Sequence, residues 1–161
     1  MDATNSSFSV RPVAFVHNTR TSLEDDNWGS ITSTIELADD IPSESLDGIE
    51  SFSHVEIFFI FHKIIDEPIA DWKGHPRGNP DWEEVGIFAM RKKRRMNFIG
   101  STIVPLIERK ERALIVRNLD AIDETPVVDI KPVMQGFLPD APITQPSWAD
   151  ALMQNYWKKT L

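Results

Sequence analysis

The sequence predicts a mainly β fold, either a strand-rich barrel or a sandwich. Seven short segments rich in β-branched and aromatic residues follow one another along the chain, and such alternating or continuous apolar runs are typical of strands. Turn-forming residues separate these segments, and helical periodicity is confined to two others. Many short strands at close spacing favour a barrel or a sandwich over an α/β fold.

The predicted strands differ in the burial that their patterns indicate. Residues 31–37 alternate apolar and polar positions, which predicts one buried face. Residues 54–62 alternate at first and then run apolar, as a strand buried on both faces would. Pro105, inside the fifth segment, predicts a sheet edge or a bulge. The predicted strands are residues 12–17, 31–37, 54–62, 84–90, 100–109, 112–119 and 126–130.

Two segments favour helix. Residues 42–52 predict a short helical turn, and residues 146–159 predict a longer helix near the C-terminus. In the longer helix we expect Ser147 at the N-cap, with Asp150 three residues later in a pair like a capping box. One face of this helix would carry Trp148, Leu152 and Tyr156.

Residues 64–86 predict a long loop, because Pro68, Pro76 and Pro80 interrupt any regular element there. Loops of this length within a compact domain are usually functional or disordered.

The composition indicates one globular domain. A chain of 161 residues with 41% hydrophobic and 26% charged residues is long enough to bury a core. The absence of cysteine excludes disulfides, thiolate zinc sites and cysteine nucleophiles. We expect a cytoplasmic location without a membrane span, because residues 1–10 lack a secretion-signal pattern and the longest apolar run, 57–61, is short.

The charge of the chain is unevenly distributed. The net charge is −8, from 17 basic and 25 acidic residues, which argues against broad non-specific binding of nucleic acid. Residues 91–95 are all cationic, and without them 12 basic and 25 acidic residues would leave −13. This run is either a solvated turn or an anion-binding loop. Gly100, which follows it closely, would allow a near approach of the backbone to another group.

The familiar nucleotide motifs are absent, and the histidines do not form a metal-binding pattern. The sequence contains neither a P-loop nor a Gly-rich Rossmann fingerprint. The spacing of the histidines predicts no metal site. His54 and His62 bracket an apolar strand, where histidines are either hydrogen-bonded strand ends or, at the position of His62, functional groups.

Acidic residues cluster in residues 119–132. They belong either to a solvated turn before a strand or to a ligand loop, in which carboxylates accept hydrogen bonds from a ribose or an amine. Asp129 interrupts an apolar strand and therefore needs a partner. The acidic residues are Asp120, Asp123, Glu124 and Asp129.

Four stretches in this order resemble the TsaA-like family, also called the TrmO family, whose best-known members methylate threonylcarbamoyladenosine in tRNA. The resemblance covers about residues 10–135. Some family features are missing: "LEDDNWGS" stands where the family has "PRQ", and "RKKRRMNF" replaces "RSPFRPNP". The matching stretches are "AFVHNT" (14–19), "LDGIESFSHVEIFFIFH" (46–62), "VGIFAMRKKRRMNFIGST" (85–102) and "NLDAIDETPVVDIKPV" (118–133).

The resemblance implies a single β-barrel over residues 8–140, with short peripheral helices, and a helix-bearing extension over residues 141–161. It implies an S-adenosylmethionine-dependent N-methyltransferase that acts on a modified adenosine of the tRNA anticodon loop, usually as a homodimer. Two alternatives stay open: a small-molecule acceptor used with the same donor site, and a non-catalytic barrel that binds nucleotides.

The resemblance also implies the site residues. Three groups are candidates to take the acceptor's proton, namely Asp129, Asp123 and His62. Lys92, Lys93 and Arg94 are additions in this chain, which would contact tRNA phosphates, the carboxylate of a smaller acceptor, or solvent. The implied donor-binding residues are His62, Lys63, Arg91, Arg95, Asn97, Ser101, Asp120, Ile122, Asp123 and Thr125.

Overall fold

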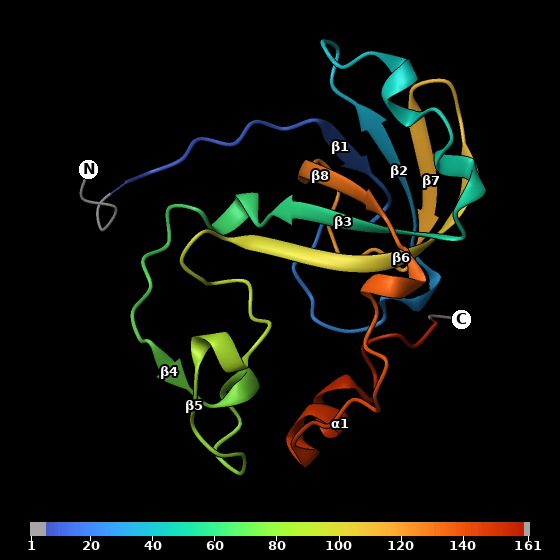
Figure 1. Cartoon of the computed structure of the whole chain (residues 1–161). Coiled ribbons are helices and arrows are strands. Elements are labelled where there is room, and N and C mark those ends of the chain that lie inside the picture. The colour runs from blue at the N-terminus through green and yellow to red at the C-terminus, as the bar shows by residue number, and fades with distance from the viewer. Residues whose placement is uncertain (1–5, 160–161) are drawn as a thin grey trace.

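The structure, a computed structural model that describes residues 6–159, is a closed six-stranded barrel (Figure 1). Neighbouring strands pair antiparallel in the order β1-β2-β7-β6-β3-β8. The predicted mainly β fold and single barrel are therefore confirmed. The barrel strands are β1 (Ala14–His17), β2 (Thr32–Leu37), β3 (His54–Ile60), β6 (Ile99–Arg109), β7 (Ala113–Arg117) and β8 (Pro126–Pro132).

The core lies inside the barrel, where alternate side chains of every strand meet. On β3, Val55, Ile57 and Phe59 are buried, whereas Phe58 and Ile60 on the other face are only half-buried. The expectation that this strand is buried on both faces was wrong, because a barrel strand has a single inner face. The alternation predicted for β2 is confirmed.

Strand β6 changes partner along its length. Its residues from Ile99 to Pro105 pair with β3, and those from Leu106 onward pair with β7. The pairing with β7 shifts register between Leu106 and Glu108. The bulge predicted near Pro105 is confirmed, since the irregularity begins at the residue after the proline.

The prediction of a strand over residues 84–90 was wrong. Only β5 (Val85–Gly86) is extended, and it pairs with β4 (Lys73–Gly74) in a small ribbon within the long connection. A 3-10 helix, Ile87–Ala89, follows directly. Ile87 and Met90 are buried while Phe88, between them, is 75% exposed. The two buried residues are three positions apart, which is the repeat of a 3-10 helix. The apolar run therefore forms a helical turn here and not a strand.

The predicted helices form, but they are shorter than expected. Residues 42–52 make two 3-10 turns on either side of Gly48, whose φ is 86°. The C-terminal helix α1 (Ser147–Met153) begins after Pro146, so the predicted cap at Ser147 was wrong. Asp150 instead accepts a hydrogen bond from the Gln145 amide. None of the helices within residues 6–159 is long and apolar enough to cross a membrane.

Further 3-10 helices lie in the connections. They are Trp28–Ser30, His62–Ile64, Pro76–Gly78 and Gln135–Phe137, besides the turns Ser43–Leu46 and Ile49–Ser51 around Gly48.

The segment after α1 packs against the connection between β1 and β2 of its own chain. The backbone amides of Asn27, Trp28 and Gly29 donate to the carbonyls of Asn155, Tyr156 and Lys158, over 3.1, 2.8 and 3.2 Å. The helix α1 itself lies against the long connection, where the rings of Trp82 and Trp148 are 6.4 Å apart. The domain boundary near residue 140 stays a prediction.

The topology gathers three long connections at one end of the barrel. β3 ends and β6 begins there, since Ile60 lies opposite Ile99. β1 ends beside the start of β8, since Phe15 lies opposite Pro126. β7 ends at the same level, where Arg117 faces Thr32 at the start of β2. The connections that leave from this end are residues 18–31, 61–98 and 118–125.

We expect Gly29→Ala to destabilise the protein by about 2 kcal/mol, as overpacking does in a well-packed interior. A Cβ on Gly29 would lie 1.9 Å from the Trp157 carbonyl oxygen, so the C-terminal segment would have to move. Urea denaturation followed by circular dichroism measures the change. Gly136→Ala is the control, because a Cβ there meets nothing within 4 Å. Equal free energies of unfolding for the two variants would contradict the packing described.

Candidate functional site

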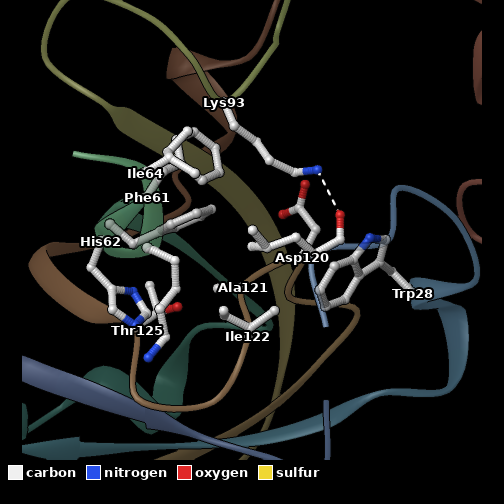
Figure 2. Close-up of a pocket in the computed structure, with 12 residues that line it drawn as sticks. Trp28, Phe61, His62, Ile64, Lys93, Asp120, Ala121, Ile122 and Thr125 are labelled. Carbon is white, nitrogen blue, oxygen red and sulfur yellow. Dashed lines mark hydrogen bonds between the residues drawn. The ribbon is translucent and has the colours of Figure 1, made fainter. Parts of the chain in front are cut away.

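A pocket opens at the barrel end where the three connections meet (Figure 2). Figure 2 shows Trp28 and Asp120 on one side of it, and Phe61, His62 and Ile64 on the other. The lining residues are Leu23, Trp28, Phe59, Phe61, His62, Lys63, Ile64, Lys93, Asp120, Ala121, Ile122 and Thr125.

Aromatic rings form one wall of the pocket. Phe59 and Phe61 pack edge to face, with ring centroids 5.3 Å apart and planes at 83°. Gly100 on β6 leaves room for them, since a Cβ there would lie 2.5 Å from the Phe59 ring and 2.9 Å from the Phe61 ring. The close approach predicted at Gly100 is therefore confirmed, and the approaching group is this aromatic wall.

Asp120 is the carboxylate of the pocket. Its two oxygens accept hydrogen bonds from the hydroxyls of Thr102, which points inward from β6, and Tyr156 in the C-terminal segment. Burial and the nearby Asp120 charge raise the pKa of Tyr156 well above its ordinary value. The phenol therefore stays protonated and donates to the carboxylate.

His62 lines the pocket and has one unpaired ring nitrogen among the described residues. Burial, together with the charge of Lys63, lowers the pKa of His62 below its ordinary value, so the ring is neutral at pH 7. Its Nε2 is buried and has no hydrogen-bond partner among residues 6–159. A buried polar atom of this kind needs a partner, and a bound ligand can supply one.

Arg20 holds the loop that carries Trp28. Its guanidinium stacks on the Trp28 ring, with the central carbon 3.8 Å from the ring centroid. The same group donates to the carbonyls of Glu24 and Asn27, over 2.8 and 3.3 Å. These contacts fix Trp28 as part of the pocket wall.

Asn18 and Asp123 tie two of the connections together. The Asp123 carboxylate accepts the Asn18 backbone N–H over 3.1 Å. The Asn18 amide donates to the Ala121 carbonyl and the Ser33 hydroxyl, over 2.8 and 2.9 Å. Asp123 therefore supports the pocket loop from behind and does not line the pocket.

Acidic partners neutralise two of the cations at 91–95. Lys93 reaches across the pocket mouth to the Leu23 carbonyl, at 2.8 Å, and to the Asp25 carboxylate (Figure 2 shows Lys93 above the pocket). Arg94 pairs with Glu67. These two side chains therefore hold the cationic run against the neighbouring loop segments at the pocket.

The other cations of the run have no carboxylate partner within the described residues. Arg91 donates to the Ser101 carbonyl over 2.5 Å, and Arg95 to the Met90 carbonyl over 2.9 Å. Lys92 makes no ion pair within the described part of the chain. Neutral carbonyls leave the guanidinium charges uncompensated, so positive charge remains beside the pocket.

The structure gathers some of the predicted site residues and separates others. Asp129 lies on the outer face of the barrel, beside Phe58 on β3, where it pairs with Lys131 at 3.0 Å. Asn97 is exposed beyond the cationic run. The predicted residues that line the pocket are His62, Lys63, Asp120, Ile122 and Thr125; Arg91, Arg95 and Ser101 lie in the adjacent loop and strand.

Sequence reasoning missed the apolar and aromatic wall, namely Leu23, Trp28, Phe59, Phe61 and Ile64, and also the two partners of Asp120, Thr102 and Tyr156. Thr102 carried a signal, because it is a polar residue at an inward position of a strand. Tyr156 was placed on an apolar helix face, but its partner 36 residues away in the chain could not be read from that pattern.

Comparison with known proteins agrees with this architecture. A probable S-adenosyl-L-methionine-binding protein of Pyrococcus abyssi is 36% identical over 112 residues, which cover 66% of this chain and 55% of that protein. The tRNA (adenine(37)-N6)-methyltransferase of Homo sapiens is 36% identical over 114 residues, covering 71% of this chain and 25% of that protein. The chain therefore spans about half, or less, of these relatives.

The barrel also resembles a solved structure. The crystal structure of TrmO from Pseudomonas aeruginosa superposes with a TM-score of 0.72 at 24% identity, over 91% of this chain and 64% of that one. The family model of the tRNA-methyltransferase O N-terminal domain matches residues 15–137. Because these residues contain nearly the whole barrel and its pocket, the chain belongs to the TrmO family.

Proposed function

We propose that this protein is an S-adenosylmethionine-dependent N-methyltransferase that acts on a modified adenosine in the tRNA anticodon loop. The observation that carries the proposal is a pocket built from the family's motif segments, with an aromatic wall, a carboxylate and a neutral histidine. Relatives named as S-adenosylmethionine-binding proteins and as tRNA methyltransferases support it.

The pocket residues fit the methyl donor chemically. Aromatic and aliphatic walls, such as Phe61 and Ile122, suit an adenine ring. Asp120 would accept hydrogen bonds from ribose hydroxyls or an ammonium group, and Lys63 would attract a carboxylate. His62 Nε2 would find its missing partner in the bound molecule.

The chain's own residues would orient the reactants and move a proton. When bound, the donor supplies a methyl group on a sulfonium, which transfers in line to a nucleophilic nitrogen, so positioning provides much of the acceleration. Of the three proton acceptors considered, His62 is favoured, because its neutral ring lines the pocket and its Nε2 has no hydrogen-bond partner among residues 6–159. Asp123 is engaged with Asn18, and Asp129 lies on the outer face.

The charge beside the pocket supports tRNA as the acceptor. Arg91, Lys92 and Arg95 are free of carboxylate partners within the described residues and would contact phosphates. Phe88 is 75% exposed just before this run, and exposed aromatic rings stack on unpaired bases. An acceptor of this kind would place the protein in the cytoplasm.

A small-molecule acceptor is the second candidate. Asp25 and Glu67 already neutralise Lys93 and Arg94, which reduces the charge available for an RNA backbone. The net charge of −8 also disfavours contact between a large polyanion and the protein surface outside this loop. The donor site would be the same.

We also propose that the chain forms a homodimer through the outer face of β6. Ile99 and Ile103 lie on that face and are 41% and 45% exposed, and Ile107 further along the strand is 47% exposed. Alternate residues of a strand point the same way, so Ile99 and Ile103 share one face. Together with Ile107, which is exposed at the bulge between Leu106 and Glu108, they form a row of exposed isoleucines along β6. Exposed apolar rows of this kind mark interaction surfaces.

We expect the donor to bind, and Arg91→Ala to weaken binding about tenfold, since hydrogen bonds to charged groups contribute about 1.5–3 kcal/mol. Arg91 fixes the start of β6 through the Ser101 carbonyl, and its charge acts on Tyr156, which donates a hydrogen bond to the pocket residue Asp120. Isothermal titration calorimetry with S-adenosylmethionine measures the affinity. Arg94→Ala is the control, because Arg94 pairs with Glu67. No binding at millimolar donor would refute the methyltransferase proposal in favour of a binding module.

We expect methyl transfer to total tRNA from a strain that lacks the family enzyme, measured with radiolabelled donor. Lys92→Ala should reduce the salt dependence of tRNA binding by about one unit of slope, because a single phosphate contact is lost. Transfer to small nitrogen compounds, with none to tRNA, would favour the second candidate.

The same transfer reaction tests His62. Because the pKa of His62 is lowered, the neutral ring persists below the ordinary histidine range, and the rate should fall only when the pH drops through that lowered pKa. His62→Gln should reduce the rate about 10²–10⁴-fold, as loss of a general base does. His54→Gln, which changes a surface histidine bonded to Ser53, should leave the rate unchanged.

We expect Ile103→Glu to convert the dimer into a monomer, because a charge in the centre of the apolar row cannot be buried without a partner. Sedimentation velocity at tens of micromolar measures the state of both proteins. Ile143→Glu is the control, since Ile143 is 76% exposed and lies outside β6. A monomeric parent protein would disprove this interface.

A further inference from the structure

Tyr156 connects the C-terminal segment to the pocket. It lies three residues beyond the end of α1, yet its hydroxyl donates to one oxygen of Asp120, while Thr102 donates to the other. Asp120 lines the pocket, whereas Tyr156 does not. The contact therefore acts on the pocket through the carboxylate.

Backbone pairing holds Tyr156 in place. The Trp28 amide donates to the Tyr156 carbonyl over 2.8 Å, and the Gly29 amide donates to the Lys158 carbonyl over 3.2 Å. The absence of a side chain at Gly29 permits this approach, because a Cβ there would lie 1.9 Å from the Trp157 oxygen. The same pairing fixes Trp28, which is itself a pocket residue, so one segment supports two parts of the wall.

The two hydrogen bonds determine how Asp120 faces the pocket. A carboxylate bound at one oxygen only can rotate about its side-chain bonds, whereas donors on both oxygens hold one orientation. Each oxygen has a second acceptor site, so Asp120 can still accept a hydrogen bond from a ligand. The orientation of that remaining site depends on Tyr156.

We propose that Tyr156 is a positioning residue for the methyl donor: it holds Asp120 so that the carboxylate accepts a hydrogen bond from a hydroxyl or ammonium group of the donor. The C-terminal segment is then part of the binding site. This inference rests on the proposed function, because it requires the donor to bind in this pocket.

A double-mutant cycle tests the proposal by calorimetry with S-adenosylmethionine. Tyr156→Phe keeps the ring and removes the hydroxyl, and it should weaken donor binding about tenfold, the expected effect of losing a hydrogen bond to a charged group. In an Asp120→Asn background the same change should have no further effect, because the carboxylate through which it acts is gone. Phe137→Leu is the control: this aromatic residue is 88% exposed outside the C-terminal segment, so its replacement should change the affinity less than twofold.

Ionisation of the phenol gives a second readout that needs no donor. The chain contains a single tyrosine, so the ultraviolet absorbance of tyrosinate reports on Tyr156 alone. In the folded protein it should not ionise near pH 10, and Asp120→Asn should lower the pH at which it does. Ionisation near pH 10 with an unchanged circular dichroism spectrum would show that the contact is absent, and would overturn the inference.

The outcomes separate the two proposals. If the parent protein binds no donor, the proposed function fails and the inference fails with it. If the parent protein binds the donor but Tyr156→Phe binds it equally well, or weakens it equally in both backgrounds, only the inference fails.

Discussion

Closure of the antiparallel barrel is the constraint on which the rest of the structure depends. Its seam is short, with Ala14 opposite Val127 and Phe15 opposite Pro126. Because every neighbouring pair is antiparallel, successive connections alternate between the two ends of the barrel. The three connections that build the pocket therefore emerge together at one end, supported by one apolar interior. If the seam opened, the loops after β1 and before β8 would separate and the pocket would be lost.

Long irregular loops at this end require partners for their polar groups, and they find them in one another. Asn18 bonds to the loop before β8, and Arg20 bonds to the carbonyls of the loop before β2. Asp120 joins β6 to the C-terminal segment. Since buried polar groups must be satisfied, these bonds make the loops rigid without regular secondary structure, and a rigid wall is what a binding pocket needs.

The cationic run at residues 91–95 gives an acidic protein a local region of positive charge. Lys93 and Arg94 form ion pairs with Asp25 and Glu67, and these pairs hold the cationic loop in place. Arg91, Lys92 and Arg95 have no carboxylate partner among the described residues, so their positive charge remains beside the pocket. The run is therefore not a simple solvated turn, because Lys93 and Arg94 hold the structure together, while anion binding by the other three cations stays a prediction.

Local patterns in the chain were enough to place the barrel strands and the segments that surround the pocket, because alternation and turn residues report on each strand's own burial. His62, Asp120 and Thr125 could be proposed as neighbours only through the family resemblance. Other features depended on tertiary contacts: the turn at Ile87, the position of Asp129 on the outer face, and the partnership of Tyr156 with Asp120. These depend on which distant segments pack together, and a side chain's partners across the fold leave no periodic trace in the sequence around it.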